Sequence, residues 1–123
     1  MKEKCTLDNL VKRAAKRAEL ANEPMTIYVP SLDAEIDFIR LTEIEKKEFL
    51  TSYSSGNVDS IEINYQILYN CCPLMQDKAL HELLEVTNPV DVVGKVFSMA
   101  EVGVIADMLL EIKDGDGIKL VKN

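Results

Sequence analysis

The side chains best suited to chemistry in this sequence are one histidine, His81, and three cysteines, Cys5, Cys71 and Cys72. A histidine-based triad would have to use His81, which lies in a leucine-rich helical segment beside Glu82. Because triads are recognised by geometry, this histidine is expected at the surface or at the edge of a groove. The four side chains could nominally bind zinc, but the paired spacings Cys-x-x-Cys and His-x-x-x-His are absent. We therefore expect buried, inert thiols.

Other motifs that carry chemistry are also missing from the sequence. Asp114-Gly115-Asp116-Gly117 is similar to the start of a calcium-binding loop, which needs about twelve residues ending in a bidentate glutamate. Only six residues follow Gly117, and none of them is acidic. No glycine-rich phosphate loop is present, and no carboxylate stands out in an apolar setting. We therefore predict that the protein is not an enzyme and needs neither a metal nor a cofactor.

Length and composition place the chain among ordinary globular proteins. Of its 123 residues 47% are hydrophobic and 28% are charged, so residues 1–123 are predicted to fold as a single domain. An odd number of cysteines, two of them adjacent, favours a reducing cytoplasm. The longest apolar run, Val102 to Leu110, is interrupted by Asp107 and is far shorter than the ~20 residues of a membrane span. We expect no membrane partner.

Charge is unevenly distributed along the chain. Residues 1–22 carry a net charge of +3 and residues 23–123 a net charge of −10, which together give −7. The acidic part should repel nucleic acid, so no nucleic-acid partner is expected. The basic start is interpreted either as a solvated helix face or as an arm that docks on an acidic surface, such as the body of a neighbouring copy.

Hydrophobic periodicity predicts a mainly α (α+β) fold, a small helical domain with an N-terminal helix, one β-hairpin and about five further helices. The predicted segments are a basic amphipathic helix or arm at 1–22, a β-hairpin at 25–41, a helical body at 42–113 and a flexible tail at 114–123. Capping side chains mark the helix starts: Thr6, Asp59 and the capping boxes Thr42–Glu45 and Ser98–Glu101. The central helix after Asp59 is expected to be an inner helix that ends at Pro73.

Two apolar stripes are candidate partner-binding surfaces. The first lies on the N-terminal helix and comprises Leu7, Val11 and Ala14, and the second lies on the last helix and comprises Val102, Ile105, Leu109 and Ile112. For either stripe the alternative is that the same side chains form the core of the domain. The whole apolar side of the N-terminal helix is mostly alanine, so this helix is expected to be loosely held or completed by a partner. The residues of this side are Leu7, Leu10, Val11, Ala14, Ala15, Ala18 and Ala21.

A family resemblance is carried by the segment Asn70-Cys71-Cys72-Pro73-Leu74-Met75-Gln76-Asp77, followed by Leu80, Pro89, Val93 and Glu101. With the predicted order of hairpin and helices, this pattern resembles the tail assembly chaperones of tailed bacteriophages and of defective prophages in Gram-positive bacteria. The resemblance covers about residues 25–113. The sequence departs from the family at the hairpin turn, where Pro30–Asp33 replaces a glycine-rich turn that bears tryptophan.

The resemblance implies a cytoplasmic protein of the bacterial host that binds the tape-measure protein, keeps it soluble and helps to recruit tail-tube protein. Homo-oligomers are also compatible with this role. Two alternatives stay open: a structural tail or connector protein that remains in the virion, and a generic small protein-binding adaptor.

Overall fold

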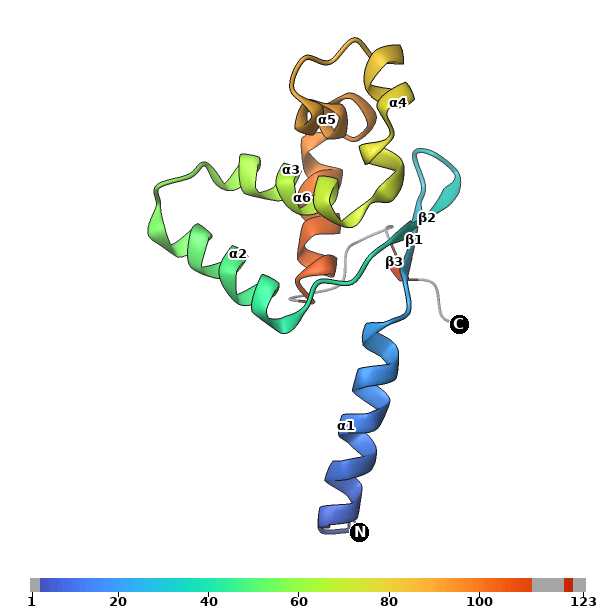
Figure 1. Cartoon of the computed structure of the whole chain (residues 1–123), viewed down its shortest axis with the longest axis vertical. Coiled ribbons are helices and arrows are strands. Elements are labelled where there is room, and N and C mark those ends of the chain that lie inside the picture. The colour runs from blue at the N-terminus through green and yellow to red at the C-terminus, as the bar shows by residue number, and fades with distance from the viewer. Residues whose placement is uncertain (1–2, 112–118, 121–123) are drawn as a thin grey trace.

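The computed structural model describes residues 3–111 and 119–120, and Figure 1 shows their arrangement. The N-terminal half contains α1 (Leu7–Ala21), β1 (Met25–Val29), β2 (Ala34–Phe38), α2 (Glu43–Ser55) and α3 (Ser60–Cys71). The second half contains the 3-10 helix η1 (Pro73–Gln76), α4 (Lys78–Leu83), the 3-10 helix η2 (Pro89–Asp91), α5 (Val92–Val96), α6 (Met99–Leu109) and β3 (Lys119–Leu120). The predicted mainly helical fold with an N-terminal helix and a β-hairpin is confirmed.

The capping side chains define the helix starts as the sequence predicts. Thr6, Thr42 and Ser98 each accept a hydrogen bond from a backbone N–H three residues on, and the third residue of each helix caps in return. Asp59 caps α3 through the N–H of Ile61. At the end of α2, Gly56 adopts a left-handed conformation with φ +70°, which costs glycine little.

The hairpin and a short third strand form a sheet of order β2-β1-β3. β1 and β2 are antiparallel, with Met25 opposite Phe38, and the Pro30–Asp33 segment turns the chain between them. Lys119 and Leu120 pair with Tyr28 and Ile27. The remainder of the predicted tail, 114–118 and 121–123, lies outside the described residues. A two-residue strand has too little sequence to show a period, so its pairing with the free side of β1 could not be predicted.

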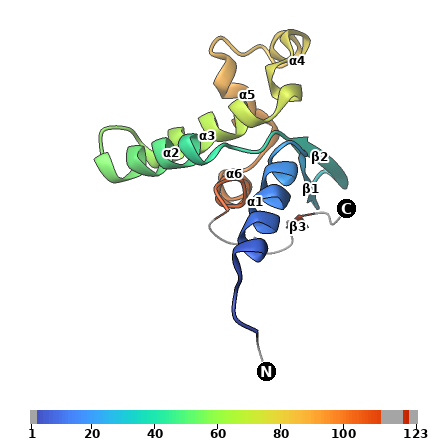
Figure 2. The same ribbon diagram turned by 60° about the horizontal axis from the view of Figure 1, so that its bottom comes forward.

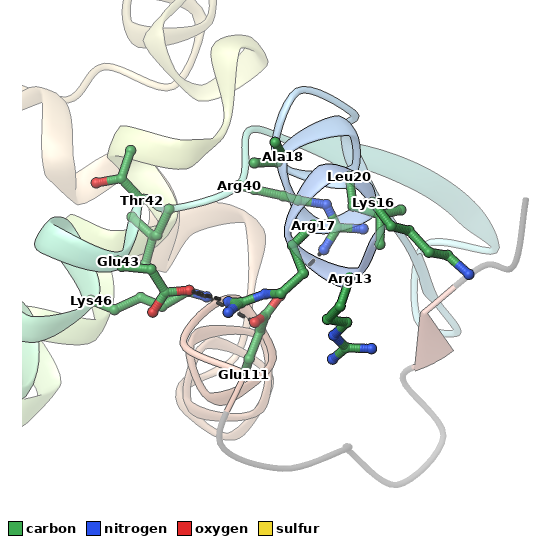
Figure 3. A pocket seen from close by; sticks show the side chains of 12 residues that line it. Arg13, Lys16, Arg17, Ala18, Leu20, Arg40, Thr42, Glu43, Lys46 and Glu111 are labelled. Carbon is green, nitrogen blue, oxygen red and sulfur yellow. Dashed lines mark hydrogen bonds and ion pairs between the residues drawn. The ribbon is translucent and has the colours of Figure 1, made fainter. Parts of the chain in front are cut away.

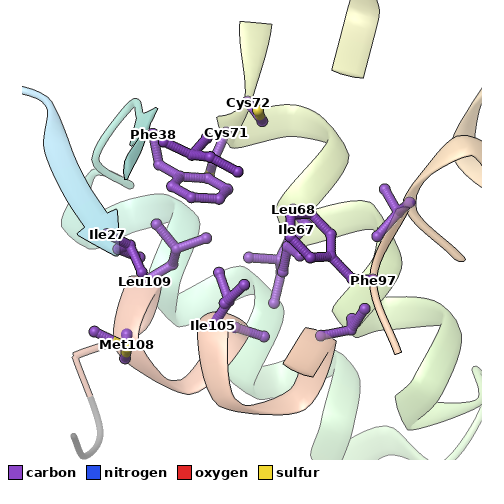
Figure 4. Packing of buried hydrophobic residues seen from close by; sticks show 14 of the residues in the cluster. Ile27, Phe38, Ile67, Leu68, Cys71, Cys72, Phe97, Ile105, Met108 and Leu109 are labelled. Carbon is purple, nitrogen blue, oxygen red and sulfur yellow. The ribbon is translucent and has the colours of Figure 1, made fainter. Parts of the chain in front are cut away.

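The core lies between the hairpin, α3 and α6, as Figure 4 shows. Alternate residues of β1 and β2 point into it, including Ile27 and Phe38. The buried residues of α3 are Ile63, Ile67, Leu68 and Cys71, and those of α6 are Val102, Ile105, Ala106, Met108 and Leu109. The N–H of Ile39, just after β2, donates a hydrogen bond of 2.6 Å to the carbonyl of Cys71 and so ties the hairpin to the end of α3.

Helix α1 differs from the rest because none of its residues is buried. In Figure 1 it leaves the sheet and extends away from the other helices, and Figure 2 shows the same helix from a view turned by 60°. Asn22 caps its end and Pro24 precedes β1, so only a short connection joins the helix to the sheet. The core is therefore complete without any side chain of α1.

Candidate functional site

The exposed face of α1 is the main candidate surface. Leu7, Leu10 and Val11 expose 80%, 59% and 61% of their surface, and Ala14 on the same side is exposed as well. Their spacing of three and four residues puts them in one stripe along the helix. Single exposed apolar residues are common, but a stripe of three large ones on a helix without a buried face is typical of a binding surface.

Basic side chains border this stripe. Arg13 and Arg17 follow Leu10 at three and seven residues, so they share its side of the helix. Lys12 lies on the other side and pairs with Asp8 at 3.1 Å. The surface therefore offers an apolar stripe with positive charge along one edge, a combination suited to an amphipathic partner with acidic residues.

A groove of about 420 Å³ runs along the C-terminal half of α1, between that helix and the segment that leads into α2. An adjoining hollow of about 600 Å³ continues it along α2 to Leu110. Figure 3 shows the charged side chains that line the groove, which come from α1, α2, the connection before α2 and the chain just after α6: Arg13, Lys16, Arg17, Arg40, Glu43, Lys46 and Glu111.

One of the ion pairs among these side chains links α1 to the body, and the others lie within the body. Arg17 Nη2 lies 2.8 Å from Glu43 Oε1, and Lys46 Nζ lies 3.4 Å from the same oxygen and 2.8 Å from Glu111 Oε2. Arg40 Nη1 approaches Glu111 Oε1 at 3.4 Å. Lys46 and Arg40 are largely covered, whereas Arg17 and Glu43 are exposed. An exposed pair contributes at most about 1 kcal/mol, so α1 is only weakly fastened by it.

The second predicted stripe is not a surface. Val102, Ile105 and Leu109 are fully or almost fully buried against α3 and the sheet, which corrects their proposed role in binding a partner. The alternative given for this stripe, that it forms the core, is the one the structure supports. Ile112 lies outside the described residues.

His81 and the adjacent cysteines serve the packing of the turn after α3. The Nε2 atom of His81 lies 2.6 Å from the carbonyl oxygen of Met75, and its ring stacks on Tyr69 with centroids 6.0 Å apart. Burial raises the pKa of the Cys71 thiol to about 12 and also raises the pKa of Cys72. Both thiols therefore stay protonated at neutral pH and are poor nucleophiles.

The cysteines differ in burial, and we therefore predict that their thiols differ in reactivity. Cys5 is exposed, whereas Cys71 and Cys72 are buried, so Ellman's reagent should modify one of the three thiols rapidly in the native protein and all three in denaturant. The Cys5→Ser variant should show no rapid reaction at all. Rapid modification of two thiols in that variant would show that the turn after α3 is open to solvent.

Sequence reasoning identified Leu7, Val11 and Ala14 but left out Leu10, although its spacing already placed it on the same stripe. It also missed the groove and its ion pairs. Glu111 lies 65 residues from Lys46 and 71 from Arg40, so no local pattern could have brought them together.

Within residues 3–111 and 119–120, no group of three or more His, Cys, Asp or Glu side chains is placed to hold a metal ion. No helix in the same part of the chain is long and apolar enough to cross a membrane. Comparisons with protein-family models, with curated proteins and with solved structures give no match.

Proposed function

We propose that the protein is a tail assembly chaperone that binds a tape-measure protein through α1, keeps it soluble and helps to bring tail-tube protein to it. The observation that supports this proposal is the apolar stripe of α1, on a helix that has no buried residue. A client helix could pack its own apolar stripe against Leu7, Leu10 and Val11 without any rearrangement of the core.

Charge and reversibility agree with such a role. The net charge of −7 would keep a client complex dispersed in solution. A stripe of three large apolar side chains gives a contact of modest area, so each copy could be displaced when the tail tube assembles. Many copies on one long client would still bind it effectively, because neighbouring contacts raise the local concentration.

Co-expression of the full chain with the tape-measure protein of the same phage tests the proposal. We expect a higher soluble yield of the tape-measure protein and a complex that co-purifies. The double variant Leu7→Asp/Val11→Asp should lose both effects and keep its circular dichroism spectrum, because both side chains are exposed. The single variants Leu7→Asp and Leu83→Asp give the matched comparison, because each introduces one carboxylate at an equally exposed leucine (80% and 79%); Leu83→Asp on α4 should behave as the wild type.

Other outcomes would contradict the proposal in distinct ways. If the tape-measure protein gains no solubility and no complex forms, the chaperone role is wrong. If the protein is found in mature phage particles, it is a structural component instead. If the double variant binds the tape-measure protein as well as the wild type does, α1 is not the docking surface.

A further inference from the structure

A second groove lies on the body, where the start of α3 meets η2. It has a volume of about 360 Å³ and is lined by the apolar parts of Ile61, Tyr65 and Val90 and by the carboxylates of Asp59, Glu62 and Asp91. The side chains that line it include no lysine or arginine. It is therefore a hollow whose lining combines apolar surface with negative charge.

Helix α1 has the complementary composition. Its stripe of Leu7, Leu10 and Val11 would cover the apolar part of this lining, and Arg13 and Arg17 border the stripe on one side. The segment that contains α1 carries +3 and the remainder of the chain −10, so the attraction extends beyond the groove itself.

The α1 helix of the same copy is badly placed to fill this groove. α1 continues into β1, whose five residues all pair with β2, so the end of the helix is fixed at the sheet. In Figure 1 the helix leaves the sheet on the side opposite to α5, which follows η2 directly. The α1 helix of a second copy is not attached to the sheet of the first copy, so this restriction does not apply to it.

We propose that α1 of one copy docks in the groove between α3 and η2 of another copy, so that copies associate head to tail. The helix and the groove are different surfaces, so the interface is heterologous. A chain of associated copies always has a free helix at one end and a free groove at the other, where the next copy can bind. This inference concerns the chain alone and does not depend on the proposed tape-measure client. Since the same stripe serves both contacts, a client helix would compete with the neighbouring copy.

Pairing of two α1 helices with each other is the competing arrangement. It would also cover the stripes, but it would bring together two segments that each carry a net +3. Like charges placed opposite one another oppose association, whereas the acidic groove favours it. The two arrangements are separated by substitutions in the groove, which α1 pairing would not involve.

Sedimentation velocity of the purified full chain at concentrations up to about 100 µM tests this arrangement. We expect association that rises with concentration and weakens when the ionic strength is raised from about 0.05 M to about 0.5 M, because salt screens the charge contacts. Arg13→Glu and Glu62→Arg should each weaken self-association about tenfold. Both side chains are exposed, and circular dichroism should confirm that both variants fold.

The decisive sample is an equimolar mixture of the two variants. In it the helix of the Arg13→Glu variant can dock in the groove of the Glu62→Arg variant, because the two charges are exchanged together. The unchanged helix can also dock in the unchanged groove, so the mixture should associate more strongly than either variant alone and approach the wild type, although only half of the copies offer each helix a matching groove. Lys78→Glu and Glu48→Arg make the same charge changes at exposed positions outside the groove and the α1 stripe, and should leave association unchanged.

A wild-type chain that stays monomeric throughout this range would overturn the proposal. So would a Glu62→Arg variant that associates normally, which would indicate pairing between α1 helices. Failure of the mixture to associate would likewise overturn the proposal, because the unchanged helix of one variant meets the unchanged groove of the other in this sample.

Discussion

Replacing Ile105 with aspartate is expected to unfold the domain. Ile105 is 0% exposed and lies on the face of α6 that packs against α3, in a core where all the buried residues that the structure describes are apolar. Burial of an unpaired charge costs at least about 4 kcal/mol, a large part of the roughly 5–15 kcal/mol that stabilises a typical domain. Urea unfolding followed by far-ultraviolet circular dichroism should show little or no native baseline.

Val11→Asp is the matched comparison because it places the same carboxylate on the other predicted stripe. Val11 is exposed on α1, so this variant should change the free energy of unfolding by no more than about 0.5 kcal/mol. Ile105→Val, which removes one methylene group, should cost about 0.5–1.5 kcal/mol. A folded Ile105→Asp protein with a wild-type unfolding midpoint would mean that α6 does not pack in the core.

Replacing Phe38 with alanine should lower the free energy of unfolding by about 3–5 kcal/mol. Phe38 is the largest of the fully buried side chains and fills the space between the end of the hairpin and the helices. Because the hydrogen bond between Ile39 and Cys71 fixes the end of the strand relative to α3, the surroundings cannot easily collapse into the cavity. Chemical unfolding measures the change directly.

Ile39→Ala provides the control on the adjacent residue. Side chains alternate along an extended chain, and Ile39 points away from the core with 58% of its surface exposed. Truncation of this side chain to alanine should lower the free energy of unfolding by less than about 1 kcal/mol, even though it removes most of an aliphatic side chain. Equal losses at positions 38 and 39 would indicate that the register of the hairpin differs from the one described.

The features that could be predicted from the sequence are those decided by neighbouring residues. Thr6, Asp59 and the capping boxes at 42–45 and 98–101 act within one helical turn, so their effect is visible in a short stretch of sequence. The hairpin is similar, since its two strands are separated by four turn residues. These short sequence patterns were therefore sufficient to predict the order of the α-helices and the hairpin, and most of their bounds.

Whether each apolar stripe is buried in the core or exposed to solvent could not be predicted in the same way. The stripes of α1 and α6 share the same helical spacing, yet one is exposed and the other is buried. What separates them is contact with α3, which depends on how distant segments meet. The only local indication was the small size of the alanines in α1, which offer little area for packing.

In helix α3 the sequence likewise does not show which apolar side faces the core. On a helical wheel Ile61 lies with Tyr65, Leu68 and Cys72 on one side, and Ile63 lies with Ile67 on the other. In the structure Ile63, Ile67, Leu68 and Cys71 are buried, while Ile61 is exposed at the edge of the acidic groove. A helix that is apolar on two sides does not show from its sequence which side faces the core.

A helix that contributes nothing to the interior also changes how the protein can evolve. Substitutions in residues 7–21 are nearly free of folding constraints, so mutation and selection can change this helix without the loss of stability that core changes bring. For the same reason a designer could exchange α1 for another amphipathic helix and leave the remaining fold unchanged.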